Sequence, residues 1–133
     1  MDFRNDEGYM DPTAFAALSK VAHEEKLPVV YLASAYSEGD VEENVHRAQH
    51  FCRCAVRADV VPIAPHLLLP QFISEETERY IAMDINRVLL RRCDALWVCG
   101  RITAGMRQEI HWAKEIGKRI RFFNDDFEEV TRA

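Results

Sequence analysis

Residues 29–37 read Val29-Val-Tyr-Leu-Ala-Ser-Ala-Tyr-Ser37, and this stretch decides the fold class. Its apolar run predicts a buried strand over about 29–34, which ends abruptly in small and hydroxyl residues. Gly39 and Asp40 follow, and Asp40 with Glu43 three residues later is typical of the start of a helix, here expected over about 41–58. A buried strand that leads through a small polar loop into a helix is characteristic of open α/β folds, which bind ligands outside the carboxyl end of the strand.

The rest of the chain continues this alternation of strands and helices. Strands are expected at 60–64, 95–99 and 119–123, and helices at 75–92, capped by Ser74, and at 104–117, capped by Thr103. Pro62 suggests that the second strand lies at an edge of the sheet. The order predicts an α/β fold, a three-layer flavodoxin-like or Rossmann-like sandwich with a mainly parallel sheet of about four to five strands.

Three other segments complete the predicted organisation. The sequence divides into an N-terminal extension, residues 1–28, with one amphipathic helix over 12–26, and an α/β domain, residues 29–133. Residues 65–73 contain two prolines among apolar residues, so we expect a long apolar loop there, of the kind that forms a lid or an interface. The acidic tail, residues 124–133, is expected to form a short turn of helix.

Composition narrows the classes of function. The chain has 133 residues and a net charge of −5, which argues against a protein that coats a nucleic acid polymer. No apolar run approaches the ~20 residues that span a bilayer, and the acidic N-terminus lacks a signal-peptide core, so we expect a cytoplasmic protein without a membrane partner. The four cysteines show no C-x-x-C spacing, and no histidine pair has metal-ligand spacing, so we expect neither a metal nor another cofactor.

The carboxyl ends of parallel strands meet at one edge of a sheet, and that edge gathers the candidate site residues. Glu109 lies one to two turns into the helix that Thr103 begins, where its carboxylate is either a surface group or a nucleophile able to attack an anomeric carbon. Asp84 lies mid-helix among apolar residues, where a carboxylate is costly unless it is paired or used in chemistry. His66 is either a ligand contact or a loop histidine with its hydrogen bonds satisfied.

A recognisable pattern runs through residues 29–123. It consists of Tyr31-Leu-Ala-Ser-Ala-Tyr-Ser37, Gly39-Asp-Val-Glu-Glu-Asn44 with Arg47, Pro62-Ile-Ala-Pro-His66, Cys93-Asp-Ala-Leu-Trp-Val98, and Gly105-Met106 with Glu109. This pattern resembles the nucleoside 2-deoxyribosyltransferase-like proteins, in particular a bacterial and phage branch. The resemblance implies a flavodoxin-like fold and cleavage or exchange of the N-glycosidic bond of a nucleoside or nucleotide.

The same resemblance implies roles for individual residues. Glu109 corresponds to the nucleophile, and Asp84 is the nearest match to the acid that assists the leaving base. Substrate contacts are expected from the first loop, its helix, the second strand end and the start of the last helix, namely Ala33, Ser34, Tyr36, Asn44, Arg47, His66, Thr103, Gly105 and Met106.

Two alternatives remain open at this point. The transferases have glutamate directly after the methionine, whereas Arg107 and Gln108 stand between Met106 and Glu109 here. This difference in spacing favours a non-catalytic module that binds a nucleotide to sequester or sense it. For either function we expect a small-molecule nucleoside or nucleotide as ligand, and a homodimer or higher homo-oligomer, since the apolar segment 67–73 would be poorly covered in a lone domain.

Overall fold

The protein, as a computed structural model, is described over residues 27–132. A five-stranded sheet forms its centre, with strands β1 (Val29–Ala33), β2 (Val61–Ile63), β3 (Ala95–Cys99), β4 (Arg119–Phe123) and β5 (Glu129–Val130). The helices are α2 (Val41–Arg57), α3 (Pro65–Leu68), α4 (Arg79–Arg92) and α5 (Ala104–Glu115), and a 3₁₀ turn, η1 (Leu69–Gln71), follows α3. The predicted α/β class and mainly parallel sheet are therefore confirmed.

The order of the strands creates a place for a ligand. It is β2-β1-β3-β4-β5, so β2 lies at an edge as Pro62 suggested. The β1–β2, β1–β3 and β3–β4 pairs are parallel, and β4–β5 is antiparallel. From β1 the chain goes outward to β2 and then returns to the other side of β1 at β3. Such a reversal opens a crevice outside the carboxyl ends of the strands.

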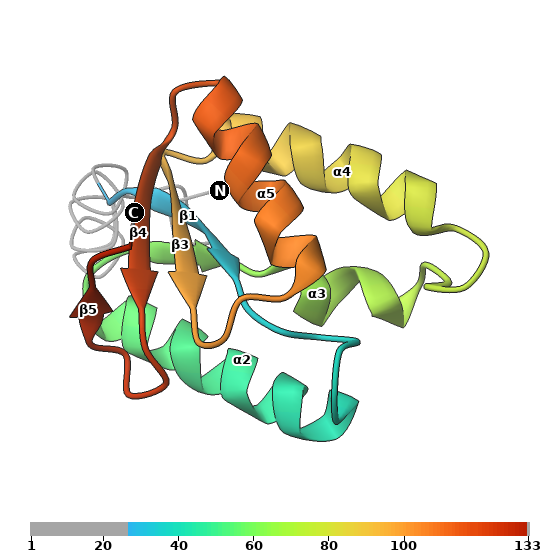
Figure 1. The fold of residues 1–133 in the computed structure, drawn as a ribbon, viewed down its shortest axis with the longest axis horizontal. Coiled ribbons are helices and arrows are strands. Elements are labelled where there is room, and N and C mark those ends of the chain that lie inside the picture. Colours follow the sequence, from blue (N-terminus) through green and yellow to red (C-terminus); the bar gives the residue numbers. More distant parts are fainter. Residues whose placement is uncertain (1–26, 133) are drawn as a thin grey trace, which may run out of the picture.

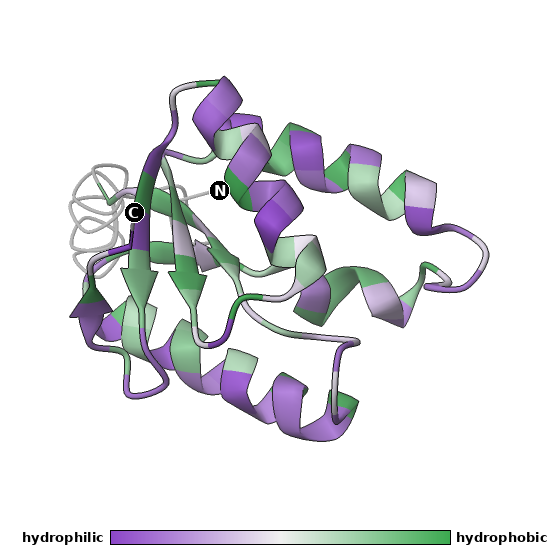
Figure 2. Ribbon diagram, in the orientation of Figure 1, coloured by the Kyte–Doolittle hydropathy of each residue, from purple (hydrophilic) through white to green (hydrophobic). Residues whose placement is uncertain are grey.

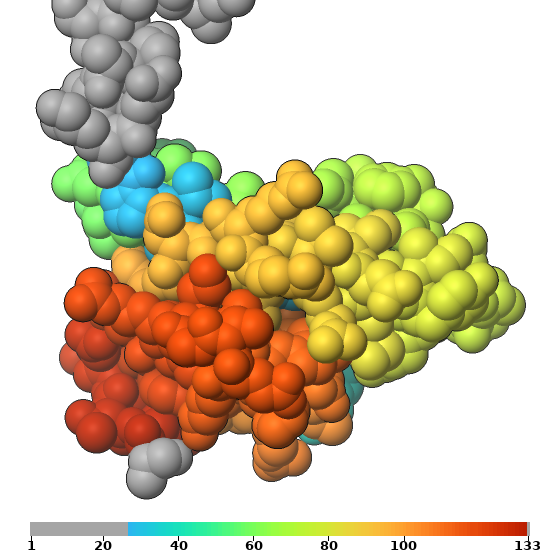
Figure 3. All heavy atoms as spheres, turned by 90° about the horizontal axis from the view of Figure 1, so that it is seen from above, coloured from blue at the N-terminus to red at the C-terminus, as the bar shows by residue number. Residues whose placement is uncertain are grey.

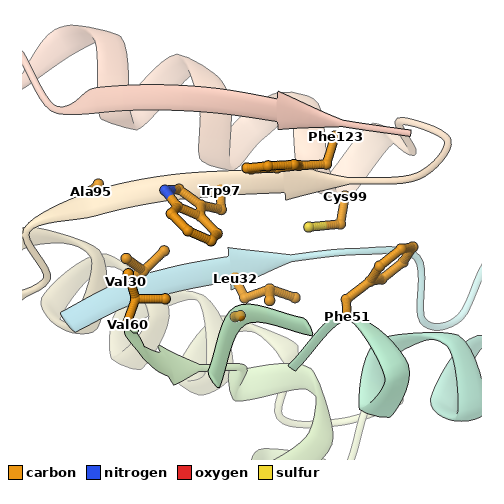
Figure 4. Close-up of a cluster of buried hydrophobic side chains, with 9 residues drawn as sticks. Val30, Leu32, Phe51, Val60, Ala95, Trp97, Cys99 and Phe123 are labelled. Carbon is orange, nitrogen blue, oxygen red and sulfur yellow. The ribbon is translucent and has the colours of Figure 1, made fainter. Parts of the chain in front are cut away.

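Alternate residues of β1 serve the two faces of the sheet. Val30 and Leu32 pack with Phe51 of α2 on one face, in the cluster that Figure 4 shows. Tyr31 and Ala33 belong to the opposite cluster, under α4 and α5. Helices therefore cover both faces, α2 on one and α4 with α5 on the other (Figure 1). The three-layer sandwich is the predicted architecture.

Hydropathy follows the same layers. The central strands β1 and β3 are mostly apolar, whereas the helices alternate between polar and apolar residues (Figure 2). All five residues of β3 are buried, as expected for a strand that is covered on both faces. Within residues 27–132, no helix is both long and apolar enough to cross a bilayer.

Two predicted caps fix the helices that flank the site. The Oδ1 atom of Asp40 accepts a hydrogen bond from the Glu43 amide at 3.2 Å, at the start of α2. The Oγ1 atom of Thr103 accepts from the Met106 amide at 3.3 Å, at the start of α5. Each cap satisfies a backbone N–H that the first turn of a helix leaves without a partner.

The prediction of a long loop over 65–73 was wrong. Pro65 begins α3 and Pro70 lies in the first turn of η1. A proline is tolerated in a first turn because the missing N–H would have no helical partner there. The prolines therefore start two short helical segments, which makes the region more compact than a loop.

The helix expected from residue 75 starts later, at Arg79. Ser74 does accept a hydrogen bond from the Thr77 amide, at 3.3 Å, and its own amide donates to the Glu78 side chain at 3.0 Å. These bonds close a separate turn over 74–78 instead of the first turn of α4. That turn projects at one end of the molecule (Figures 1 and 3).

The chain ends also differ from expectation or lie outside the description. The tail was expected to form a helical turn, but Asn124 accepts hydrogen bonds from the amides of Asp126 and Glu128 at 3.0 and 2.9 Å. That turn sends the chain back as β5, antiparallel to β4. The N-terminal helix expected over 12–26 lies outside the described residues.

Candidate active site

A cavity of about 230 Å³ opens at the carboxyl edge of the sheet. The loop after β1, the start of α3, one face of α4 and the first half of α5 all contribute to its wall. Ser34, Tyr36 and Glu109, which are far apart in the sequence, line this one cavity. Pockets of about 300–1,000 Å³ hold drug-sized ligands, so the space suits a small one.

Glu109 and Tyr31 form a hydrogen-bonded pair on the cavity wall. The Tyr31 hydroxyl, which comes from a buried residue of β1, donates a hydrogen bond to Oε2 of Glu109 on α5. This bond joins the sheet to the helix and fixes the direction of the carboxylate. Glu109 is half-buried and lines the cavity.

Burial changes the acidity of both members of this pair. Loss of solvation raises the pKa of Glu109 to about 7, and the hydrogen bond from Tyr31 offsets part of that rise. Burial, with the neighbouring carboxylate, raises the pKa of Tyr31 well above its ordinary value. Tyr31 therefore remains a hydroxyl donor at neutral pH, while Glu109 is close to half ionised. A carboxyl group with this pKa is a good candidate for chemistry at neutral pH.

A second pair lies on the same wall. The Oγ atom of Ser34 and the Nε2 atom of His66 are 2.7 Å apart, which joins the end of β1 to the start of α3. Burial lowers the pKa of His66 to about 4, so the imidazole is neutral at physiological pH. The pair thus offers uncharged hydrogen-bonding groups, which suit sugar hydroxyls or the polar edge of a base.

The start of α5 forms the remaining polar part of the wall. Thr103, Gly105 and Met106 all line the cavity. Thr103 and Met106 are themselves buried, and their hydrogen bonds hold the first turn of the helix, whereas Gly105 is exposed. An added Cβ at Gly105 would meet no atom closer than 4.0 Å, so the glycine leaves the helix backbone open to a ligand.

Three residues expected to contact substrate lie outside this cavity. Ala33 is buried in β1. Asn44 donates to the carbonyl oxygens of Tyr36 and Glu38 at 2.8 and 2.9 Å, so its amide stabilises the loop instead of facing a ligand. Arg47 bonds to Glu43 at 2.8 Å and lies 3.4 Å from Asp125. Asn44 and Arg47 line a separate small hollow on the α2 side of the sheet.

The expectation for Asp84 also needs correction. Asp84 is exposed and does not line the cavity, so its carboxylate meets solvent and needs no buried partner. The wall is formed instead by Arg79, Ala82, Met83 and Asn86, which recur at helical spacing along α4. Asn86 lies two residues after Asp84, about 200° around the helix.

Sequence reasoning missed most of the wall, including Tyr31, Glu38 and Asn86. The sequence placed Tyr31 in the first strand, and none of these three residues was given a role at the site. The Oδ1 atom of Asn86 is buried and accepts no hydrogen bond within residues 27–132. The helical spacing of Ala82, Met83 and Asn86 could have indicated that they share one face of α4. No local sequence pattern could have indicated that Tyr31 contacts Glu109.

Within the described range 27–132, no three His, Cys, Asp or Glu side chains are grouped to hold a metal ion.

Comparison with other proteins identifies the family of this chain. No curated protein matches this sequence. Residues 28–123 match a family described as a domain of unknown function, DUF7768. Those residues include the whole parallel sheet and every helix that lines the cavity, so the chain belongs to the DUF7768 family.

Proposed function

We propose that the protein cleaves or exchanges the N-glycosidic bond of a nucleoside or nucleotide, with Glu109 as nucleophile. The observation that supports this most is the Glu109 carboxyl group, fixed by Tyr31 at the wall of a cavity. A retaining glycosidase uses such a carboxylate to form a covalent glycosyl-enzyme. The resemblance to nucleoside 2-deoxyribosyltransferase-like proteins points to the same class of reaction.

The proposed reaction has two displacements at the anomeric carbon. A Glu109 oxygen forms a bond to that carbon, while the bond to the base nitrogen breaks and its electron pair leaves with the base, which takes a proton from water. Water or a second base then attacks the same carbon, gives up a proton and releases the carboxylate. Asp84 has no role in this scheme, because it lies outside the cavity.

The rest of the cavity fits a sugar-linked heterocycle. Tyr36 and Trp112 provide aromatic surface on which a planar base can stack. The neutral pair of Ser34 and His66 offers hydrogen bonds to a sugar. We also propose a cytoplasmic location, since the four cysteines Cys52, Cys54, Cys93 and Cys99 are all free, as is usual in a reducing compartment.

A substitution at Glu109 tests the nucleophile. Glu109→Gln should lower the rate of base release by at least about 10²-fold, because loss of a nucleophile is among the largest single losses in catalysis. The measurement is chromatography of free base over a panel of nucleosides and their monophosphates. Glu115→Gln is the matched control, since Glu115 is exposed on the same helix.

Undiminished turnover in Glu109→Gln would reject the nucleophile. The alternative, a module that binds a nucleotide without cleaving it, predicts a different result. In that case a nucleotide would raise the melting temperature of the wild-type protein and be recovered intact after long incubation.

The Tyr31 hydrogen bond gives a second prediction, in the pH dependence. The attacking group is the ionised carboxylate, so the rate should rise with pH through the Glu109 pKa of about 7. Tyr31→Phe removes the bond that lowers this pKa and should move the midpoint of the pH–rate profile to higher pH. Tyr80→Phe, on the exposed part of α4, is the control. An unchanged midpoint in Tyr31→Phe would show that the Tyr31 hydroxyl does not lower the pKa of Glu109.

We propose, in addition, that the protein is a homodimer or larger homo-oligomer. Large apolar side chains are exposed along segment 68–83, including Phe72 at 64 % and Tyr80 at 67 % exposure. Met83 belongs both to this surface and to the cavity wall. A second copy packed here would bury apolar area and narrow the mouth of the cavity.

Light scattering tests the oligomer. At micromolar concentration the wild-type protein should have at least twice the mass of the chain, and Phe72→Glu should shift it toward the monomer. Val56→Glu is the control, because Val56 is exposed to 55 % on the other side of the sheet. A wild-type protein that is monomeric under these conditions would contradict the proposal.

A further inference from the structure

Glu38 lies in a loop whose backbone is held in place from two sides. The Asn44 amide donates to the carbonyl oxygens of Tyr36 and Glu38, and the Arg101 guanidinium also donates to the Glu38 carbonyl. Gly39 allows this approach, since its φ is +95° and an added Cβ would lie 2.7 Å from Nη2 of Arg101. The loop therefore has a defined position, although the Glu38 side chain is exposed.

The Glu38 carboxylate lies where an anionic ligand would bind. Its Oε2 atom is 3.5 Å from the backbone nitrogen of Ala104, the first residue of α5. A helix N-terminus attracts negative charge through its free N–H groups and its dipole. Here a carboxylate of the chain itself meets that end of the helix, and both Glu38 and Ala104 line the cavity.

The other charges on the wall add to this effect. Arg79 is the cationic side chain that lines the cavity, and its Nη1 atom lies 3.7 Å from the Glu75 carboxylate, which is also on the wall. His66 is neutral at physiological pH, because burial keeps its pKa near 4. The wall is therefore net negative with Glu109 protonated, and more so once Glu109 ionises. This net negative charge disfavours the binding of a dianionic phosphate in the cavity.

Asn86 is a wall residue with one hydrogen-bond acceptor left unused within residues 27–132. Its Oδ1 atom is buried without a hydrogen-bond partner within the described residues. Buried polar atoms are normally satisfied, so a free acceptor on a wall residue points to a donor that lies beyond residues 27–132. The amino or ring N–H groups of a nucleobase, or a sugar hydroxyl, are uncharged donors of this kind.

We propose that the ligand is an uncharged nucleoside, and that Glu38 is a specificity-determining residue that excludes the corresponding 5′-monophosphate. This inference rests on the proposed function and chooses between the two ligand classes that it allows. Glu38 occupies the position at the start of α5 where a phosphate would otherwise gain the most. An uncharged nucleoside is not repelled by the Glu38 carboxylate, and it can still contact Glu109, Tyr36 and the pair formed by Ser34 and His66.

Calorimetric titration with a nucleoside and its own 5′-monophosphate tests the proposal. The wild-type protein should bind the nucleoside about tenfold or more tightly than the monophosphate, since one close pair of charges in a wet site is worth nearly a factor of ten. Glu38→Gln keeps a hydrogen-bond acceptor for Ala104 but removes the charge, so it should bring the two affinities close together. Glu38→Ser, with a smaller side chain, should do the same.

Glu42→Gln is the matched control, because Glu42 is exposed in the first turn of α2 and does not line the cavity. It should leave the affinity ratio unchanged. Raising the ionic strength should narrow the wild-type ratio by screening, and should have a smaller effect on the ratio of Glu38→Gln.

Several results would overturn the inference. One is a wild-type protein that binds the monophosphate as tightly as the nucleoside, or more tightly. Another is a ratio that Glu38→Gln leaves unchanged. If monophosphates are preferred and their cleavage depends on Glu109, the role of Glu38 is wrong and the proposed function stands. If neither class binds, both proposals fail.

Discussion

The hydrogen bond between Tyr31 and Glu109 is the constraint on which the account of this site depends. It joins the central strand β1 to α5, and it holds a half-buried carboxyl group at the wall of a cavity. Loss of solvation favours the protonated acid, whereas the Tyr31 hydroxyl favours the ionised one. Because these two effects oppose each other, the carboxyl group titrates near neutrality and both of its forms are populated in a cell.

Placing an acid in this position costs stability. The folded state keeps the Glu109 proton up to about pH 7, whereas an ordinary glutamate loses it near 4.5. The folded state therefore binds more protons between these values, and its stability falls as pH rises through that range. The loss amounts to roughly 3 kcal/mol at most.

The fold explains how such distant residues meet. At the reversal of strand order beside β1, the loop after β1, the start of α3 and the start of α5 all reach one edge of the sheet. Asn44 and Arg101 fix the first loop through its carbonyl groups, and Thr103 fixes the first turn of α5. These residues bind the backbone, so they define the shape of the cavity, while its charge comes from Glu38, Glu75, Arg79 and Glu109.

Local patterns predicted what local forces determine. The apolar run before Ser34 and the caps at Asp40 and Thr103 gave β1 and the starts of α2 and α5 to within about a residue. Pro65 and Pro70 were interpreted as helix breakers, yet each lies in a first turn, where a proline is accommodated.

Features that depend on tertiary packing could not be predicted from the sequence. The face of α4 that lines the cavity depends on how that helix packs against α5. The sequence does not show this packing, so Asp84 was predicted as a site residue, whereas Asn86 lines the cavity. The contact of Tyr31 with Glu109 spans 78 positions along the chain and leaves no periodic trace. The position of Glu38 at the start of α5 is likewise a product of the folded loop.

The pKa of Glu109 in the folded protein is the quantity that tests this account most directly. It can be measured by carbon-13 NMR of protein labelled at the glutamate carboxyl groups, with the Glu109 resonance identified by its loss in Glu109→Gln. The account predicts one glutamate resonance that titrates near pH 7 and moves to higher pH in Tyr31→Phe. A Glu109 resonance that titrates near pH 4.5, like an exposed side chain, would contradict it.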